Sequence, residues 1–462
     1  MKKLLLSLLA VFAFSNIVFG ATTYYVATNG SDSNTGTSTS PFLTISYAYT
    51  LAGPGDSIIV KPGTYTDYTP WVGLDLINSG TPGNPIVLKS QIKWQAIIDG
   101  GNISDHISGI RIHGDYHVID GFEITNGFEE GVYIAGTALN NIIKNNHIHH
   151  NGNIGDPNSA NGQDGVLSEE YTSGTIYDAN SIHHNGRISL NSNLDHGMYL
   201  TGDNEIIMNN IISYNCSYGL HIVGYDTVSN MKVYNNVLAW NGRSGAVMWH
   251  DIKGVDFENN IFYSNDELGL LCYDAHGTGV VIANNIFYAN VQGTTNMVWA
   301  GSNVAYTMGT NYLTSDPLFL NSANDFHLQA GSPAIDLGVT LSTVTHDFEG
   351  TARPQGVAYD IGCIEYHTGT TGIATNTNEL SVNLFPNPCN GSTNLEVRGT
   401  NELKDCSYDI RITNLIGEEV FRSSSLFNRN LKLDISHLPA GSYFLKLYSE
   451  SGAITRKIII EK

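Results

Sequence analysis

Residues 194–204, LDHGMYLTGDN, contain several side chains that can move protons within a few positions of each other. His196 follows an aspartate, Tyr199 lies three positions later, and a second histidine, His221, follows a later glycine. Histidine can accept a proton near neutral pH, and tyrosine can donate one to a leaving oxygen. We therefore take His196 or His221 as the candidate base and Tyr199 as the candidate acid.

One reaction would use these groups together. Elimination from a uronic-acid sugar needs a base for the C5 proton, an acid for the leaving oxygen and a positive group beside the carboxylate. Arg187 is the candidate positive group. A calcium ion could serve as well, because it prefers several oxygen ligands. The carboxylates that would hold calcium are Asp164, Glu169, Asp195 and Asp203.

Two other functions fit the same residues. Glycoside hydrolysis needs two carboxylates about 5–5.5 Å or about 6.5–9.5 Å apart, and Glu169, Asp195 and Asp203 could supply such a pair. The third possibility is a protein that binds a glycan without cleaving it. In that case the histidines would be polar members of a repetitive scaffold.

A repeat in the middle of the chain determines where these side chains point. A glycine followed by an alternating strand recurs 22 to 34 residues apart between positions 109 and 269, as GIRI, GVYI, GVLS, GMYL, GLHI, GAVM and GLLC. Asparagines recur in two columns, at 146, 180, 210, 236, 260 and 285, and at 151, 185, 215, 241, 265 and 290. Short strands with registered asparagines indicate an all-β, right-handed parallel β-helix, in which each asparagine hydrogen-bonds to the next coil.

Alternation within each strand separates core from surface. The buried positions are predicted to be Val132, Met198, Leu220, Ala246 and Leu270. The outward column that follows them is Arg111, Tyr133, Leu167, Tyr199, His221, Val247 and Leu271, and Trp249 and Tyr273 belong to a second column. Aromatic rings stack on the C–H faces of sugars. The candidate substrate-binding residues are therefore Arg111, Tyr133, Trp249, His250 and Tyr273.

Two coils are longer than the others. Their extra residues, 152–163 and 186–194, follow the same bend in consecutive coils. Long insertions in a regular solenoid are usually binding or catalytic loops. We expect these two loops to wall one end of the outward face and to bring Asp164, Arg187 and Asp195 to it.

Histidine pairs recur at one position of two consecutive coils. NNHIHHNG contains His149 and His150, and SIHHNG contains His183 and His184. Stacked histidine pairs could bind a transition metal. The two segments offer no aspartate or cysteine partner, so we expect the histidines to be registered coil residues.

Composition limits the class of protein. The 462 residues carry a formal net charge of −21, which argues against nucleic acid and anionic membranes as partners. Residues 1–20 combine Lys2 and Lys3 with a short apolar run, which is typical of a signal peptide and indicates an exported, soluble mature chain. The five cysteines show no CxxC spacing. Cys389 and Cys406 could form one disulfide.

Both ends of the repeat resemble secreted β-helix proteins of the pectin-lyase-like class from Bacteroidetes. The N-terminal segment 23–64 is similar to their cap, in which residues 42–51 would form a short helix, and residues 316–338 and 347–366 are similar to their closing segment. Some of these proteins are polysaccharide lyases, so the resemblance implies an extracellular polysaccharide as partner. Many such lyases use a lysine base, but Lys144, Lys232 and Lys253 do not fall on the outward columns. The paired-aspartate motifs of β-helix pectin hydrolases are also absent from the sequence.

The C-terminal part of the chain changes in composition. A linker at 367–378 follows the predicted β-helix of 21–366. Residues 379–462 contain FPNP, NLIGEEV and LPAGSYFLKL, which resemble the β-sandwich sorting domain of the type IX secretion system. The resemblance implies export across an outer membrane, with the protein either released or attached at the cell surface. The secretion machinery would be its partner.

Overall fold

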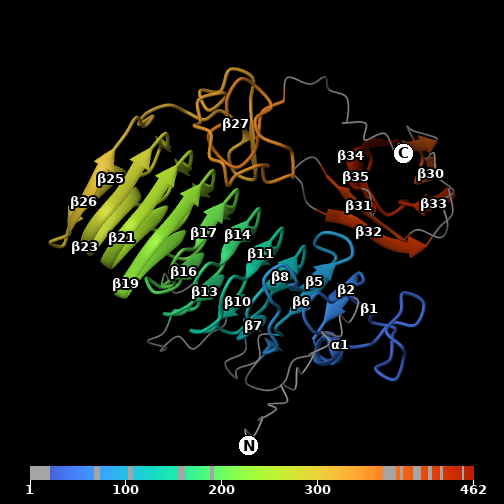
Figure 1. Ribbon diagram of the computed structural model, residues 1–462. Helices are drawn as coiled ribbons and strands as arrows, with labels where there is room; N and C mark the ends of the chain where they lie inside the picture. Colours follow the sequence, from blue (N-terminus) through green and yellow to red (C-terminus); the bar gives the residue numbers. More distant parts are fainter. Residues whose placement is uncertain are drawn as a thin grey trace, which may run out of the picture.

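The computed structural model describes residues 21–66, 73–101, 108–153, 162–187, 192–367 and, with short gaps, 381–461. Its central part is a stack of coils that runs from the blue N-terminal strands to the yellow ones in Figure 1. Each coil contributes one strand segment to each of three parallel faces. The predicted right-handed parallel β-helix is confirmed. The proposed signal peptide, residues 1–20, lies outside the described residues.

Face 1 carries the predicted glycine-led strands. It consists of β4 (Leu74–Leu76), β7 (Ile110–Ile112), β10 (Val132–Ile134), β13 (Val166–Ser168), β16 (Met198–Leu200), the first parts of β19 (Leu220–Tyr234), β21 (Ala246–Glu258) and β23 (Leu268–Ala283), and β25 (Gly293–Trp299).

Face 2 continues each coil. It consists of β1 (Thr23–Val26), β2 (Ser57–Val60), β5 (Ile86–Ser90), β8 (His117–Asp120), β11 (Ile142–Lys144), β14 (Ile176–Asp178), β17 (Ile206–Met208), the last parts of β19, β21 and β23, and β26 (Asn303–Met308). In the later coils faces 1 and 2 share long, continuous strands.

Face 3 is a separate sheet of nine strands. They are β3 (Gly63–Tyr65), β6 (Ala96–Asp99), β9 (Glu123–Thr125), β12 (His147–His149), β15 (Ser181–His183), β18 (Ile211–Ser213), β20 (Val237–Ala239), β22 (Ile261–Tyr263) and β24 (Ile286–Tyr288).

The core and the asparagine columns follow the predicted pattern. Val132, Met198, Leu220, Ala246 and Leu270 are fully buried. At the bend between faces 2 and 3, the amide of Asn210 donates to Oδ1 of Asn236 at 3.0 Å, and the backbone N–H of Asn210 donates to the same oxygen at 2.9 Å. The other members of both columns repeat these bonds. Buried amides are thus satisfied along the whole stack.

The N-terminal cap contains α1 (Ile45–Leu51), which begins three residues later than expected. Phe42 lies outside the helix because its backbone pairs with Tyr25 and Ala27. Thr44 caps the helix by accepting a hydrogen bond from the N–H of Tyr47. The buried face of α1 packs on the first coils and covers their open end.

The closing segment, residues 316–366, contains a small hairpin, β27 (Phe319–Asn321) and β28 (Asp325–Leu328), and then returns along the bend between faces 2 and 3. Asn259 donates to the carbonyl of Val339, and Asn235 donates to the carbonyl of Asp360. His346 contacts Asp178 of a much earlier coil at 2.9 Å. The segment therefore joins coils that are not neighbours.

The C-terminal domain has its own core and two antiparallel sheets, which agrees with the predicted sandwich. One sheet contains β29 (Ser381–Phe385), β30 (Ser392–Arg398) and β33 (Asn430–Asp434). The other contains β31 (Ser407–Thr413), β32 (Glu419–Leu426), β34 (Gly441–Ser449) and β35 (Gly452–Ile460). Among the described residues Cys389 is a free, buried thiol, and Cys406, its suggested disulfide partner, lies outside them.

Candidate active site

A groove with a volume of about 800 Å³ lies over face 1. Register places Tyr133 beside Arg111, Tyr199 beside Leu167, and His221 beside Tyr199. Six of the seven residues of the predicted outward column therefore line the groove, whereas Leu271 is buried and does not. Its coils, from β7 to β21, extend over about 24 Å if each of five steps is about 4.8 Å.

The residues before six of the seven repeat glycines form a second polar column, of which the sequence prediction named only Asp164 and His196. Its members are Ser108, Glu130, Asp164, His196, Tyr218 and Ser244, and their coils are joined by backbone hydrogen bonds of the glycines that follow them. Four of them, from Glu130 to Tyr218, line the groove. The signal was present in the sequence as a polar residue in front of successive glycines.

Gly197 shows why a glycine follows each of these residues. A Cβ atom at this position would lie 2.6 Å from the amide nitrogen of Asn215 and 2.6 Å from the carbonyl oxygen of Gly219. The backbone approaches the asparagine column too closely for any side chain. This close approach fixes the chain between His196 and Tyr199, and with it the direction of both side chains.

The two candidate histidines touch each other. Nε2 of His196 lies 3.0 Å from Nδ1 of His221, and both rings are buried at the groove. The backbone N–H of His196 donates to Oδ1 of Asp164 at 2.6 Å. Burial lowers the pKa of His196 to about 3, and burial and the neighbouring imidazole also lower the pKa of His221. Both rings are therefore neutral at pH 7.

Aromatic rings enclose the histidine pair. Tyr199 and Tyr218 stack on His196 with ring centroids 5.7 and 5.3 Å away, and Trp249 stacks on His221 at 5.8 Å. The hydroxyl of Tyr199 lies 2.6 Å from that of Tyr225, and burial raises the pKa of Tyr199. Tyr199 is thus protonated at neutral pH, the state that a proton donor needs.

The outer part of the groove contains the other predicted sugar contacts. His250 stacks on Trp249 with centroids 4.2 Å apart, and Tyr273 meets this tryptophan edge-on at 6.4 Å. At the opposite end, the guanidinium of Arg111 lies 4.4 Å from the centre of the Tyr133 ring. Four of the five predicted binding residues therefore line one groove, and the fifth, His250, lies beside it against Trp249.

Arg187 does not line the groove. Its Nε lies 2.8 Å from Oδ2 of Asp195 and its Nη2 lies 2.5 Å from Oδ1, in a pair that is buried on both sides. Asp195 also accepts from the backbone of Arg187 and of Gln163. The expected role of Arg187 is wrong because a buried ion pair already occupies its guanidinium. Arg243, which the prediction missed, lines the groove and pairs with Glu267 at 3.0 Å.

The four carboxylates proposed for calcium do not form one site. Asp195 belongs to the Arg187 pair, and Asp203 accepts from the backbone and hydroxyl of Ser229 at 2.7 and 2.6 Å. Glu169 accepts from the N–H of Gly136 at 2.9 Å. In the described part of the chain, three potential ligand atoms come within 4.8 Å of one another only at Glu123, His147 and His149. The predicted ligand set thus does not fit calcium.

Two acids of the second polar column have unusual pKa values. Glu130 is buried and accepts a 2.7 Å hydrogen bond from Ser108, and burial raises its pKa to about 7. Burial also raises the pKa of Asp164 well above the usual range, and the charge of Glu130 adds to the shift. These acids can hold protons at neutral pH beside the groove.

The long loops expected to wall the groove fall partly outside the described residues, at 154–161 and 188–191.

Comparison with known families agrees with this architecture. Residues 24–167 match a Pel9A-like right-handed β-helix region, residues 187–314 match a right-handed β-helix region, and residues 383–461 match a secretion system C-terminal sorting domain. The chain therefore contains a right-handed β-helix, whose first part is similar to the Pel9A-like region, followed by a C-terminal secretion sorting domain. A sorting domain of this kind indicates export. Among the described residues of this β-helix protein, no helix is long and apolar enough to cross a membrane.

Similar proteins include pectate lyases. Pectate lyase L of Dickeya chrysanthemi is 35% identical over 159 residues, which cover 32% of this chain and 37% of the relative. Pectate lyase L of Paenibacillus polymyxa is 24% identical over 340 residues, 68% of this chain and 71% of the relative. The β-helix protein thus spans well under half of the Dickeya relative. The crystal structure of pectate lyase Pel9A has a TM-score of 0.52 at 18% identity, covers 75% of this chain and 96% of its own, and supports the fold.

Proposed function

We propose that the β-helix protein is an exported polysaccharide-processing enzyme, a lyase that cleaves a uronic-acid-containing glycan by β-elimination. The observation that carries the proposal is the buried His196–His221 pair between aromatic rings in the groove. The pectate lyases among its relatives support the reaction class. The sorting domain supports export by the type IX machinery to the medium or the cell surface.

The histidine pair would act as the base. A neutral imidazole takes the proton from C5, the C–H electrons form the C4=C5 double bond, and the C4–O bond breaks towards the leaving sugar. Tyr199 donates its hydroxyl proton to that oxygen. The low pKa of the empty pair opposes protonation, but a substrate carboxylate entering the groove raises it by its charge. The second imidazole then shares the positive charge across the 3.0 Å contact.

Arginine would replace the metal that the sequence suggested. Arg111 and Arg243 lie in coils at opposite ends of the groove, where each can attract a carboxylate of a polymeric substrate. Because the four proposed carboxylates are separated, no step is assigned to calcium. Calcium dependence stays a separate proposal. Loss of all activity on EDTA treatment, with recovery on added calcium, would support it and would assign the ion to other ligands.

The test uses a panel of pectate, alginate, glycosaminoglycan and neutral glycans. Elimination produces an ultraviolet-absorbing C4=C5 bond, so wild-type protein should raise the absorbance with at least one uronate polymer. His196→Ala and His221→Ala should each lower kcat by about 10²–10⁴-fold, and the double variant should lose little more, because the rings act as a unit. His276→Ala, an exposed histidine outside the groove lining, is the matched control. Full activity in both single variants would contradict the proposed base.

A second candidate is glycoside hydrolysis, because Glu130 is a buried carboxyl with a pKa of about 7. A carboxyl protonated at neutral pH is what such an enzyme needs as its general acid. Hydrolysis would produce reducing ends without ultraviolet absorbance, and Glu130→Gln would abolish it. Retention on a glycan column with neither product would instead indicate a binding protein.

A further inference from the structure

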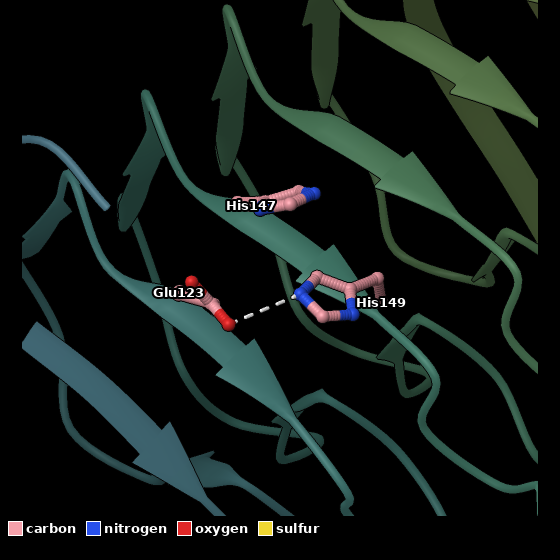
Figure 2. Close-up of side chains that lie close together, drawn as sticks. All are labelled: Glu123, His147 and His149. Atoms are coloured by element: carbon pink, nitrogen blue, oxygen red, sulfur yellow. Dashed lines mark ion pairs between the residues drawn. The ribbon is translucent and has the colours of Figure 1, made fainter. Parts of the chain in front are cut away.

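A second group of chemically active side chains lies on face 3, away from the groove. Glu123 of β9 is directly across from His147 of β12, and His149 is directly across from His183 of β15. His147 and His149 are two positions apart, so they point to the same side of the strand. Figure 2 shows Glu123, His147 and His149 on the two adjacent strands, with an ion pair from Glu123 to His149.

The ligand atoms of this group converge. One atom each from Glu123, His147 and His149 lies within 4.8 Å of the other two. Oε1 of Glu123 is 3.5 Å from Nε2 of His149. A fourth donor is close, because Nε2 of His183 lies 2.6 Å from Nε2 of His147. The sequence offered the histidines but no acidic partner, and the coil register supplies Glu123 from the preceding coil.

Neighbouring histidines orient two of these rings. Nδ1 of His149 lies 2.8 Å from Nδ1 of His150, and Nδ1 of His183 lies 2.8 Å from Nδ1 of His184. His149 and His183 therefore use Nδ1 for the contact with the neighbouring histidine, which leaves Nε2 of each ring for the cluster. Contacts to the second ring nitrogen fix the tautomer and orientation of metal-binding histidines.

The cluster contains one buried polar atom that the protein leaves without a hydrogen bond. Within the described residues, Nε2 of His149 is buried and has no hydrogen-bond partner. A buried nitrogen without a hydrogen bond costs free energy unless something binds it.

We infer that Glu123, His147 and His149 bind a transition-metal ion on face 3, with His183 as the nearest further donor. Imidazole nitrogens and one carboxylate suit zinc or a similar divalent ion, whereas calcium prefers oxygen ligands. Zinc–nitrogen bonds of about 2.0–2.1 Å in tetrahedral geometry would separate two nitrogens by about 3.3 Å. His147 and His183 would need to move apart by less than about 1 Å to reach that spacing.

The surroundings suggest what the ion would do. Trp94 covers His147 with ring centroids 4.9 Å apart and faces Phe348 of the closing segment at 6.5 Å. Lys93 lies 4.9 Å from the centres of both the Trp94 and Phe348 rings. A bound ion would therefore tie two coils of face 3 beneath the closing segment. The site is separate from the groove, so the metal-binding proposal does not depend on the proposed lyase activity.

The direct test is zinc binding by the metal-free full-length protein. Isothermal titration with Zn²⁺ should give one strong site per chain, and zinc should raise Tm because it binds only the folded state. Co²⁺ in its place should give the visible absorption bands of a low-symmetry, nitrogen-containing site. Excess Ca²⁺ should compete with neither ion. Absence of saturable zinc binding would overturn the inference.

Variants locate the ion. His149→Ala and Glu123→Gln should each weaken zinc binding at least tenfold and remove the zinc-dependent rise in Tm, while His276→Ala should retain both. Glu123→Gln keeps the size of the side chain, so it remains informative if His149→Ala fails to fold. Unchanged zinc affinity in folded Glu123→Gln and His149→Ala proteins would show that any bound ion lies elsewhere.

Discussion

Glu205 is a carboxyl group buried inside the β-helix without a cation beside it in the described structure. Ser168 donates to its Oε1 at 2.7 Å, and the hydroxyls of Thr172 and Tyr177 lie 3.4 Å from the same oxygen. Burial raises the pKa of Glu205 from 4.5 to about 7. Hydrogen bonds from these hydroxyls reduce the upward shift of the pKa but do not remove it, because an ionised carboxylate away from water is poorly solvated.

Glu205→Gln should therefore change the pH dependence of stability. The folded pKa lies above the unfolded one, so folded protein binds more protons between pH 4.5 and about 7. The free energy of unfolding should fall as pH rises through this window, by about 1.4 kcal/mol for each unit of pKa shift. The glutamine variant should lose this part of the slope. Urea unfolding below and above the window measures it, with exposed Glu461→Gln as control; equal slopes in all three proteins would contradict it.

At the scale of elements, the coil bends combine an asparagine column with a left-handed residue. The residue before the column asparagine has positive φ in each bend, as at Asn209 (57°), Asn235 (53°) and Asn259 (59°). Asparagine tolerates this conformation well, which explains the repeated Asn-Asn pairs. The second bend is less well adapted, since Ala289 takes a φ of 57° there. Unlike asparagine, alanine has no polar side chain whose local hydrogen bonds could favour this left-handed conformation.

Ala289→Gly should consequently stabilise the protein, against the usual effect of glycine. Removing the Cβ relieves about 1–2 kcal/mol of strain, and the greater freedom of the unfolded glycine takes back about 0.5–1 kcal/mol. A small rise in Tm is expected. Ala283→Gly in β23 is the matched control and should lower Tm, because no such strain is present in a strand. A fall in Tm in both variants would refute the assignment of strain.

The sequence predicts elements better than it predicts contacts between loops. The repeat correctly places Tyr199 beside His221, because strand alternation and coil register are local properties. The Arg187–Asp195 pair could not be read in this way, because it depends on how a loop folds back on itself. Glu123 was missed because it becomes a neighbour of His149 only across a coil. The residue types of the groove were predictable, but their hydrogen-bond partners were not.

At the scale of the molecule, one buried arginine holds the closing segment together and joins it to a coil. Arg353 lies 2.5 Å from Glu365 and donates to the carbonyl of Gly362 at 2.8 Å. It also reaches Oδ1 of Asn209, a left-handed bend residue, at 3.3 Å. Most contacts of a solenoid join adjacent repeats. The closing segment adds contacts that bridge several repeats at once.

Arg353→Ala should lower the free energy of unfolding by about 3–5 kcal/mol, because it leaves Glu365 buried without a partner. Hydrogen exchange should accelerate at the bends around Asn209, Asn235 and Asn259, where the segment docks. Arg353→Met with Glu365→Leu should recover part of the loss by removing both charges. Exchange that accelerates only inside residues 316–366 would show that the segment does not stabilise the coils.

The same segment sets an order of events during folding. Coil contacts join residues about one repeat apart, whereas Asn235 and Asp360 are separated by 125 positions and Asp178 and His346 by 168. Closing such long loops is slow compared with pairing neighbouring coils. The groove lies entirely on coils that can pair before this docking takes place. A newly made chain can therefore assemble the coils of its groove while its last tertiary contacts are still unmade.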